Sequence, residues 1–97
     1  MTNHERIARQ AGAALRRIRA NRRLRQRVVA ERAGISAARL SLYENGRQLP
    51  TFAILGQLLS SLGCSAEEFG RYYGPWGEIE TLQRQEEAGA ALATTGA

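Results

Sequence analysis

The side chains best suited to chemistry in this chain of 97 residues are its guanidinium groups. There are fourteen arginines, no lysine and no aspartate. Four of the arginines stand close together, at Arg22, Arg23, Arg25 and Arg27. A planar guanidinium is permanently charged and binds phosphate oxygens through two parallel hydrogen bonds. The cluster therefore predicts a clamp on a phosphate-rich partner, and a solvated turn is the alternative interpretation.

The residue types that enzymes and metal sites use are almost missing. His4 is the only histidine and Cys64 the only cysteine, and without aspartate no Ser-His-Asp triad can be assembled. A zinc site with two thiolates and an internal disulfide both need a second cysteine. We therefore expect no enzyme, no metal and no cofactor, and we interpret Cys64 as a small buried hydrophobic residue.

Positive charge is concentrated in the first half of the chain. Residues 1–50 contain twelve arginines and three glutamates, whereas residues 51–97 contain two arginines and six glutamates. This asymmetry indicates a polyanion as the partner of the first half. Two alternatives stay open: GC-rich coding favours arginine over lysine, and arginines on helix surfaces can simply be solvated. With no membrane span and no signal peptide in the pattern, we expect a cytoplasmic protein.

Helical signals extend over the first 73 residues. Apolar residues recur at helical spacing, and each run begins or ends at capping residues such as Ser36 and Gly34. These signals predict helices at about 3–20, 26–33, 37–44, 52–62 and 66–73. No strand pattern is present. The predicted fold class is therefore all-α, a compact bundle of four or five helices.

A run of helix-breaking residues, Gly74-Pro75-Trp76-Gly77, marks a boundary. We expect a domain at 1–73 and a C-terminal extension at 74–97. The extension has a further helical pattern, in which Ile79 and Leu82 could pair with a second copy of the chain or bind another protein. A half-disordered extension is the other interpretation.

The most informative spacing surrounds the predicted turn between the second and third helices. Ala30, Gly34 and Leu40 follow the pattern Ala-x3-Gly-x5-Leu. A small residue at Ala30 lets the two helices cross, Gly34 permits a sharp turn, and Leu40 fills the crossing. Two helices joined in this way form a helix-turn-helix.

The stretch from about Leu15 to Phe69 resembles the Cro/phage-repressor-like, or Xre-type, helix-turn-helix family. The matching segments are IRANRRL (18–24), Gln26, VA (29–30), AGIS (33–36), LSLYENG (40–46), Pro50 and LLSSLGCS (58–65). The resemblance implies a lambda-repressor-like fold and a sequence-specific transcription regulator that binds double-stranded DNA. Repressor-like dimers on inverted repeats are common in this family, so the resemblance also implies a homodimer associated with the nucleoid.

The resemblance also implies roles for individual residues. The helix at 37–44 would be the recognition helix in the major groove. Arg19 and Glu44 match a structural ion pair of the family and would belong to the scaffold. The candidate DNA-binding residues are Arg25, Gln26, Arg27, Ser36, Ala37, Ala38, Arg39, Ser41, Leu42, Asn45 and Arg47. Among them, Gln26, Asn45 and Arg47 stand where the family contacts the phosphate backbone.

This sequence departs from the family at the positions that usually read bases. Ala37, Ala38 and Leu42 cannot hydrogen-bond a base, although they can contact thymine methyl groups. Arg25 replaces the usual Ser or Thr cap of the second helix and is better suited to phosphate. We therefore expect specificity to rest on one or two arginine contacts, methyl contacts and DNA shape.

A second function stays open. In an antitoxin-type or other partner-binding regulator, residues 74–97 would bind another protein while the helix-turn-helix regulates its own operon. The regulator of a restriction–modification operon would use the same DNA contacts. The operator and the regulated genes are not encoded in any of these patterns.

Overall fold

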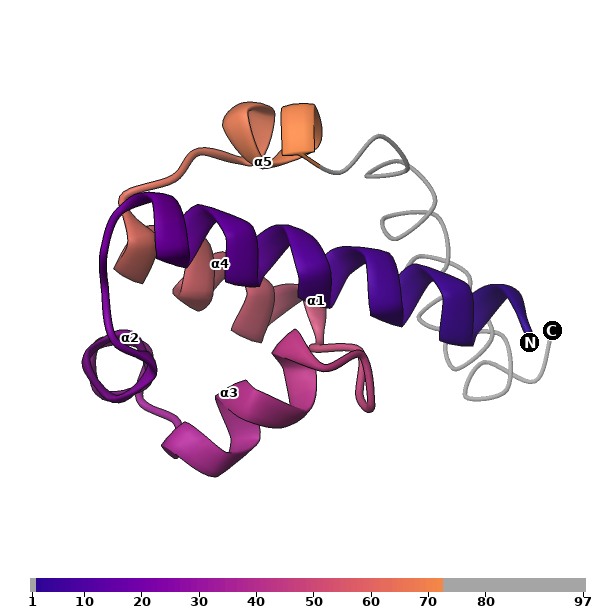
Figure 1. Cartoon of the computed structure of the whole chain (residues 1–97), viewed down its shortest axis with the longest axis horizontal. Helices are drawn as coiled ribbons and strands as arrows, with labels where there is room; N and C mark the ends of the chain where they lie inside the picture. The colour runs from indigo at the N-terminus through magenta and orange to yellow at the C-terminus, as the bar shows by residue number, and fades with distance from the viewer. Residues whose placement is uncertain (1, 73–97) are drawn as a thin grey trace, which may run out of the picture.

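The computed structural model describes residues 2–72, which form five helices and no strand (Figure 1). The helices are α1 (Asn3–Asn21), α2 (Gln26–Ala33), α3 (Ala37–Glu44), α4 (Phe52–Leu62) and α5 (Ala66–Tyr72). Their bounds agree to within one residue with those expected from the sequence, and the all-α class is confirmed. No helix in this part of the chain is long and apolar enough to cross a membrane. The predictions for residues 74–97 lie outside the described residues.

Hydroxyl side chains cap four of these five helices. At each N-terminus a hydroxyl oxygen accepts a hydrogen bond from a backbone N–H three residues ahead, which satisfies a donor that the helix itself leaves open. The capping residues are Thr2, Ser36, Thr51 and Ser65, with distances of 3.0 to 3.2 Å. Local chemistry therefore sets where α1, α3, α4 and α5 begin.

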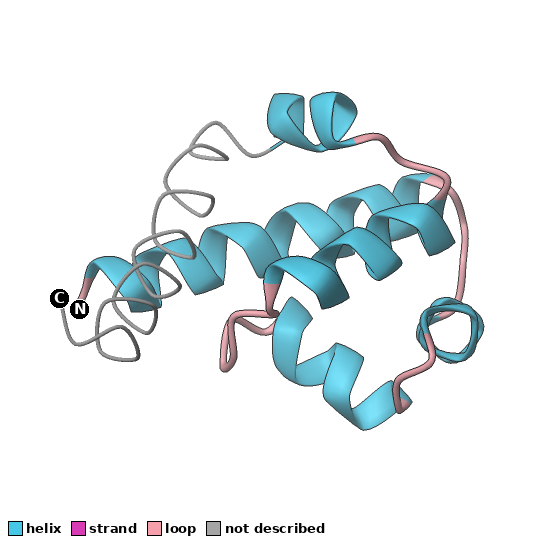
Figure 2. Cartoon of the chain, turned by 180° about the vertical axis from the view of Figure 1, so that it is seen from behind, coloured by secondary structure: helices cyan, strands magenta, loops and turns pink. Residues whose placement is uncertain are grey.

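The helices are arranged around α1 and α4, which run along the length of the molecule. Figures 1 and 2 show α2 and α3 on one side of them and α5 on the opposite side. Leu15 and Ile18 of α1 and Leu55 and Leu58 of α4 are completely or almost completely buried. The first turn of α5 is acidic, whereas α2 and α3 have no acidic residue in their first turns.

Cys64 lies in the core, next to the glycine that ends α4. Burial raises the pKa of its thiol, so the group stays protonated at neutral pH. Its sulfur donates a weak hydrogen bond of 3.4 Å to the carbonyl oxygen of Ser65. The thiol therefore packs as a small hydrophobic side chain, as the sequence predicted.

Gly12 makes the closest approach between α1 and α3. A Cβ atom at this position would overlap the carbonyl oxygen of Tyr43 and would lie 2.9 Å from that of Glu44. Both obstacles are backbone atoms, which cannot swing aside as a flexible side chain can. Gly46 makes a second close approach, because its Cβ would lie 2.6 Å from the Cα of Arg9. The end of α3 is thus held against α1 at two glycines.

We expect opposite effects from alanine at two helical glycines. Gly12→Ala should lower the free energy of unfolding by about 2–3 kcal/mol, because the new methyl group forces α1 and α3 apart. Gly56→Ala should raise it by about 0.5–1 kcal/mol, because Gly56 is exposed in α4 and nothing lies within 4 Å of the added atom. Urea denaturation measures both. An unchanged or raised free energy of unfolding in Gly12→Ala would contradict the close approach at Gly12.

Candidate nucleic-acid interface

Residues 34–36 connect α2 to α3 in a sharp turn. Gly34 adopts φ 73°, and its N–H donates to the carbonyl of Glu31, while the N–H of Ile35 donates to that of Ala30. These two bonds form a Schellman motif, which a residue in the left-handed region makes possible. Ala30 and Leu40 are each 1% exposed at the crossing of the helices. The three residues of the Ala-x3-Gly-x5-Leu pattern therefore occupy the predicted places.

A buried carboxylate joins α1, α2 and α3 behind this turn. Arg19 donates from Nε to Oε2 of Glu44 at 2.7 Å and from Nη2 to Oε1 at 3.0 Å. Gln26 donates from Nε2 to the same Oε1 at 2.8 Å. The Glu44 side chain is 2% exposed. The structure thus contains the ion pair implied by the resemblance and adds a third partner to it.

Two expected phosphate ligands donate hydrogen bonds to glutamates within the chain. The side-chain amide of Gln26 points to Glu44, because a buried carboxylate needs donors for both of its oxygens. Arg22 donates from Nη2 to Oε2 of Glu68 at 2.5 Å, which ties the end of α1 to α5 and raises the pKa of Arg22. Both side chains are therefore engaged with glutamates within the chain, and their contact with phosphate stays a prediction. Gln26 can still offer its backbone N–H.

The N-terminus of α2 has no side-chain cap. Arg25 stands at the N-cap position in an extended conformation, and its side chain makes no capping hydrogen bond. Within residues 2–72, the N–H groups of Gln26 and Arg27 have no acceptor. Open N–H groups and the helix dipole attract anions. The side chains of Arg25 and Arg27 are exposed next to this helix end.

Arg23 has an unusual backbone conformation just before this helix end. Its φ is 54°, and it is the only non-glycine residue at positive φ in the described part of the chain. Arg23 N–H donates to Ala20, and Leu24 N–H donates to Arg19. The same Schellman motif ends the next three helices, where glycine occupies the left-handed position, at Gly34, Gly46 and Gly63.

The left-handed conformation of Arg23 was not predicted from the sequence. A left-handed conformation costs a non-glycine residue roughly 1–2 kcal/mol. The available signal was the missing glycine after the predicted helix at 3–20, in a chain whose other helix-ending turns have one.

The exposed surface of α3 is short of polar groups. Ala38 and Leu42 lie one helical turn apart and are exposed, with 42% of Leu42 accessible. Arg39 is exposed beside them. Ala37 is half-buried and packs against the core, so it presents less surface than the sequence implied.

The remaining candidate DNA-binding residues make hydrogen bonds within the chain or lie at the ends of α3. Ser36 uses its hydroxyl oxygen to cap the helix. Asn45 folds back, with Nδ2 donating to the carbonyl oxygen of Ser41 at 2.9 Å and to Oγ of Ser41 at 3.2 Å. Arg47 is exposed just after the Gly46 turn. Of the predicted residues, the structure therefore exposes Arg25, Arg27, Arg39 and Arg47 as charged groups around α2 and α3.

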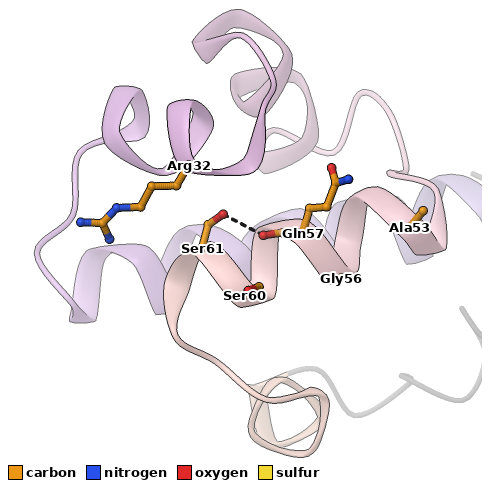
Figure 3. Close-up of a pocket in the computed structure, with 6 residues that line it drawn as sticks. All are labelled: Arg32, Ala53, Gly56, Gln57, Ser60 and Ser61. Atoms are coloured by element: carbon orange, nitrogen blue, oxygen red, sulfur yellow. Dashed lines mark hydrogen bonds between the residues drawn. The ribbon is translucent and has the colours of Figure 1, made fainter.

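An open hollow of about 630 Å³ lies between α2 and α4, and no residue of α3 lines it (Figure 3). Arg32 of α2 is the only charged residue that lines it, and small or polar residues of α4 complete the lining. Ser61 donates its hydroxyl hydrogen to the carbonyl oxygen of Gln57 at 2.7 Å. Neither an acid–base pair nor an activated nucleophile lines this hollow. No group of metal-ligating side chains gathers anywhere in residues 2–72.

Comparison with known proteins supports this assignment of the helices. A family model described as "Helix-turn-helix domain" matches residues 10–71. Two crystal structures of the clp gene regulator ClgR from Corynebacterium glutamicum are similar. The first is 29% identical, covers 71% of this chain and 90% of that chain, and has a TM-score of 0.68. The second is 27% identical, and its match covers 92% of this chain and 93% of that chain, again with a TM-score of 0.68. No curated protein sequence matches significantly.

The matched region includes α2, the turn and α3, together with the Arg19–Glu44 pair behind them. The resemblance to Xre-type proteins is confirmed, and this is a family of transcription regulators, which are not typically enzymes. The chain belongs to the helix-turn-helix domain family and is a DNA-binding transcription regulator of the Xre-like type.

Proposed function

We propose that α3 enters the major groove of double-stranded DNA while the N-terminus of α2 binds the phosphate backbone. The observation that carries this proposal is the uncapped start of α2, which lies among exposed arginines on the helix-turn-helix. The other four helix N-termini in the described residues have hydroxyl caps. No hydroxyl cap occupies the start of α2, so a phosphate oxygen can approach the open N–H groups of Gln26 and Arg27, and DNA supplies phosphates along its whole backbone. This function involves no catalytic residue, and DNA binding associates the protein with the nucleoid.

Seven arginines around the helix-turn-helix have two different tasks. Arg19 and Arg22 form ion pairs with glutamates and hold helices together. In contrast, the side chains of Arg25, Arg27, Arg39 and Arg47 are exposed and form no ion pair within residues 2–72. These four, together with the exposed Arg23, provide phosphate contacts, and Arg39 has a side chain able to hydrogen-bond guanine.

We further propose that the chain acts as a repressor-like homodimer, with residues 1–73 binding DNA and residues 74–97 as an extension. The support is the single recognition helix that each chain presents, since helix-turn-helix dimers place two such helices in successive major grooves. Pairing through the extension, and binding of another protein by it as in an antitoxin, both concern residues outside the described part. Capture of a partner by the full chain, but not by a chain ending at Tyr73, would favour the second role.

Selection of bound duplexes from random DNA tests the function as a whole. We expect an enriched site with two inverted half-sites whose centres are about 10 base pairs apart, because two recognition helices must lie one DNA turn apart. Sequencing of the bound pool measures this. Enrichment of a single half-site would contradict the dimer, and a pool without enrichment would contradict sequence-specific binding.

Salt dependence tests the phosphate contacts one by one. The affinity for the selected site should fall steeply with salt, with each contacted phosphate adding about 0.9 to the slope of log K against log[salt]. Arg47→Ala should reduce the slope by about one such step. Arg71→Ala is the matched control, because Arg71 is exposed on α5, on the side opposite α3 (Figure 1). Equal slopes for Arg47→Ala and the unmodified protein would exclude this contact.

Arg23 provides a test in which stability and affinity move in opposite directions. Arg23→Gly should raise the free energy of unfolding by about 0.5–1 kcal/mol, because glycine adopts positive φ without strain. It should also weaken DNA binding and reduce the salt slope by about 0.9, because one phosphate contact next to α2 is lost. Arg23→Asn, which tolerates this conformation and lacks the charge, should lose the same contact. Unchanged affinity in both variants would show that Arg23 does not contact DNA.

A further inference from the structure

The exposed strip of α3 formed by Ala38 and Leu42 has no polar side-chain atom. In residues 2–72, Leu42 is one of three large hydrophobic side chains with substantial exposure. Neither residue belongs to the core cluster. A leucine on the helix that enters the major groove is placed to contact bases, and it can do so only through hydrocarbon.

Two polar side chains near this strip make hydrogen bonds within the chain. The amide nitrogen of Asn45 bonds to both oxygens of Ser41. The hydroxyl oxygen of Ser36 accepts the backbone N–H of Arg39. Of the exposed charged residues on α3, Arg39 alone remains to hydrogen-bond a base, and it stands on the flank of the strip. The strip itself therefore cannot detect donors or acceptors on base edges.

The major groove offers one hydrocarbon group to such a surface, the C5 methyl group of a pyrimidine. Thymine carries it, whereas cytosine and uracil do not. 5-Methylcytosine carries the same methyl group at the same place, although its base pair with guanine presents different donors and acceptors from the thymine–adenine pair. A side chain that recognises the methyl group by burial alone does not separate these two bases.

We propose that Ala38 and Leu42 recognise the C5 methyl group itself and not the hydrogen-bonding pattern of the base pair. The ligand at this position is then any duplex step with a C5-methylated pyrimidine, either thymine or 5-methylcytosine. This inference rests on the proposed placement of α3 in the major groove. It assigns specificity to the two exposed residues of α3 that have no polar side-chain atom.

The test uses the site selected from random DNA and changes one thymine at a time in three ways. Uracil opposite adenine removes only the methyl group, and binding should weaken about fourfold at the contacted position, as expected for one buried methyl group. 5-Methylcytosine opposite guanine should bind within about twofold of thymine, because the methyl group is retained. Cytosine opposite guanine should weaken binding to the extent that uracil does. Dissociation constants for the four duplexes give the comparison.

Two variants connect the effect to the strip. Leu42→Ala should abolish the difference between thymine and uracil at one position of each half-site, and its exposed position leaves the core unchanged. Arg71→Ala should keep the full difference. Persistence of the difference in Leu42→Ala at every position would overturn the assignment to Leu42.

The duplexes also separate this inference from the proposed function. Equal binding of thymine and uracil at every position would overturn methyl recognition while DNA binding stands. Binding of 5-methylcytosine as weak as that of cytosine would show readout of the hydrogen-bonding pattern and would also overturn it. Failure to bind any duplex would overturn the proposed function instead.

Discussion

The buried carboxylate of Glu44 is the constraint on which the geometry of the DNA-facing helices depends. Removing an ionised group from water costs several kcal/mol unless donors surround it. Glu44 also stands in the last turn of α3, where the helix dipole opposes a negative charge. Arg19 and Gln26 can donate hydrogen bonds to its two oxygens only when α1, α2 and α3 pack together at this point. A packing that buried Glu44 without these donors would leave a charge without a partner.

Close backbone contact and this ion pair depend on each other. The missing side chain at Gly12 lets the last turn of α3 approach α1. This approach brings Glu44 within reach of Arg19, which follows Gly12 by seven residues in α1. Arg19 also donates from Nη1 to the carbonyl oxygen of Leu24 at 2.8 Å and so orders the turn before α2. The position of the uncapped α2 N-terminus relative to α3 thus follows from contacts made entirely behind the interface.

Much of this arrangement was predictable from the sequence because its causes are local. Ser36 and Gly34 set helix ends through neighbouring backbone groups, and the spacing to Leu40 indicated the turn. The partners of Gln26 and Arg22 were not predictable in this way, because they lie 18 and 46 residues away along the chain. In the sequence, an exposed arginine cannot be distinguished from an arginine in an ion pair, because only the fold determines which carboxylate lies near it.

The uneven placement of positive charge on the two sides of the bundle affects how the protein approaches DNA. Exposed arginines gather around α2 and α3, whereas on α5, on the far side, Arg71 and the Arg22–Glu68 ion pair offset Glu67 and Glu68 (Figure 1). A molecule charged in this way experiences a torque in the field of a polyanion, which turns α3 forward before any contact forms. More encounters then begin in a productive orientation, so the charge distribution acts on the rate of association as well as on the finished complex.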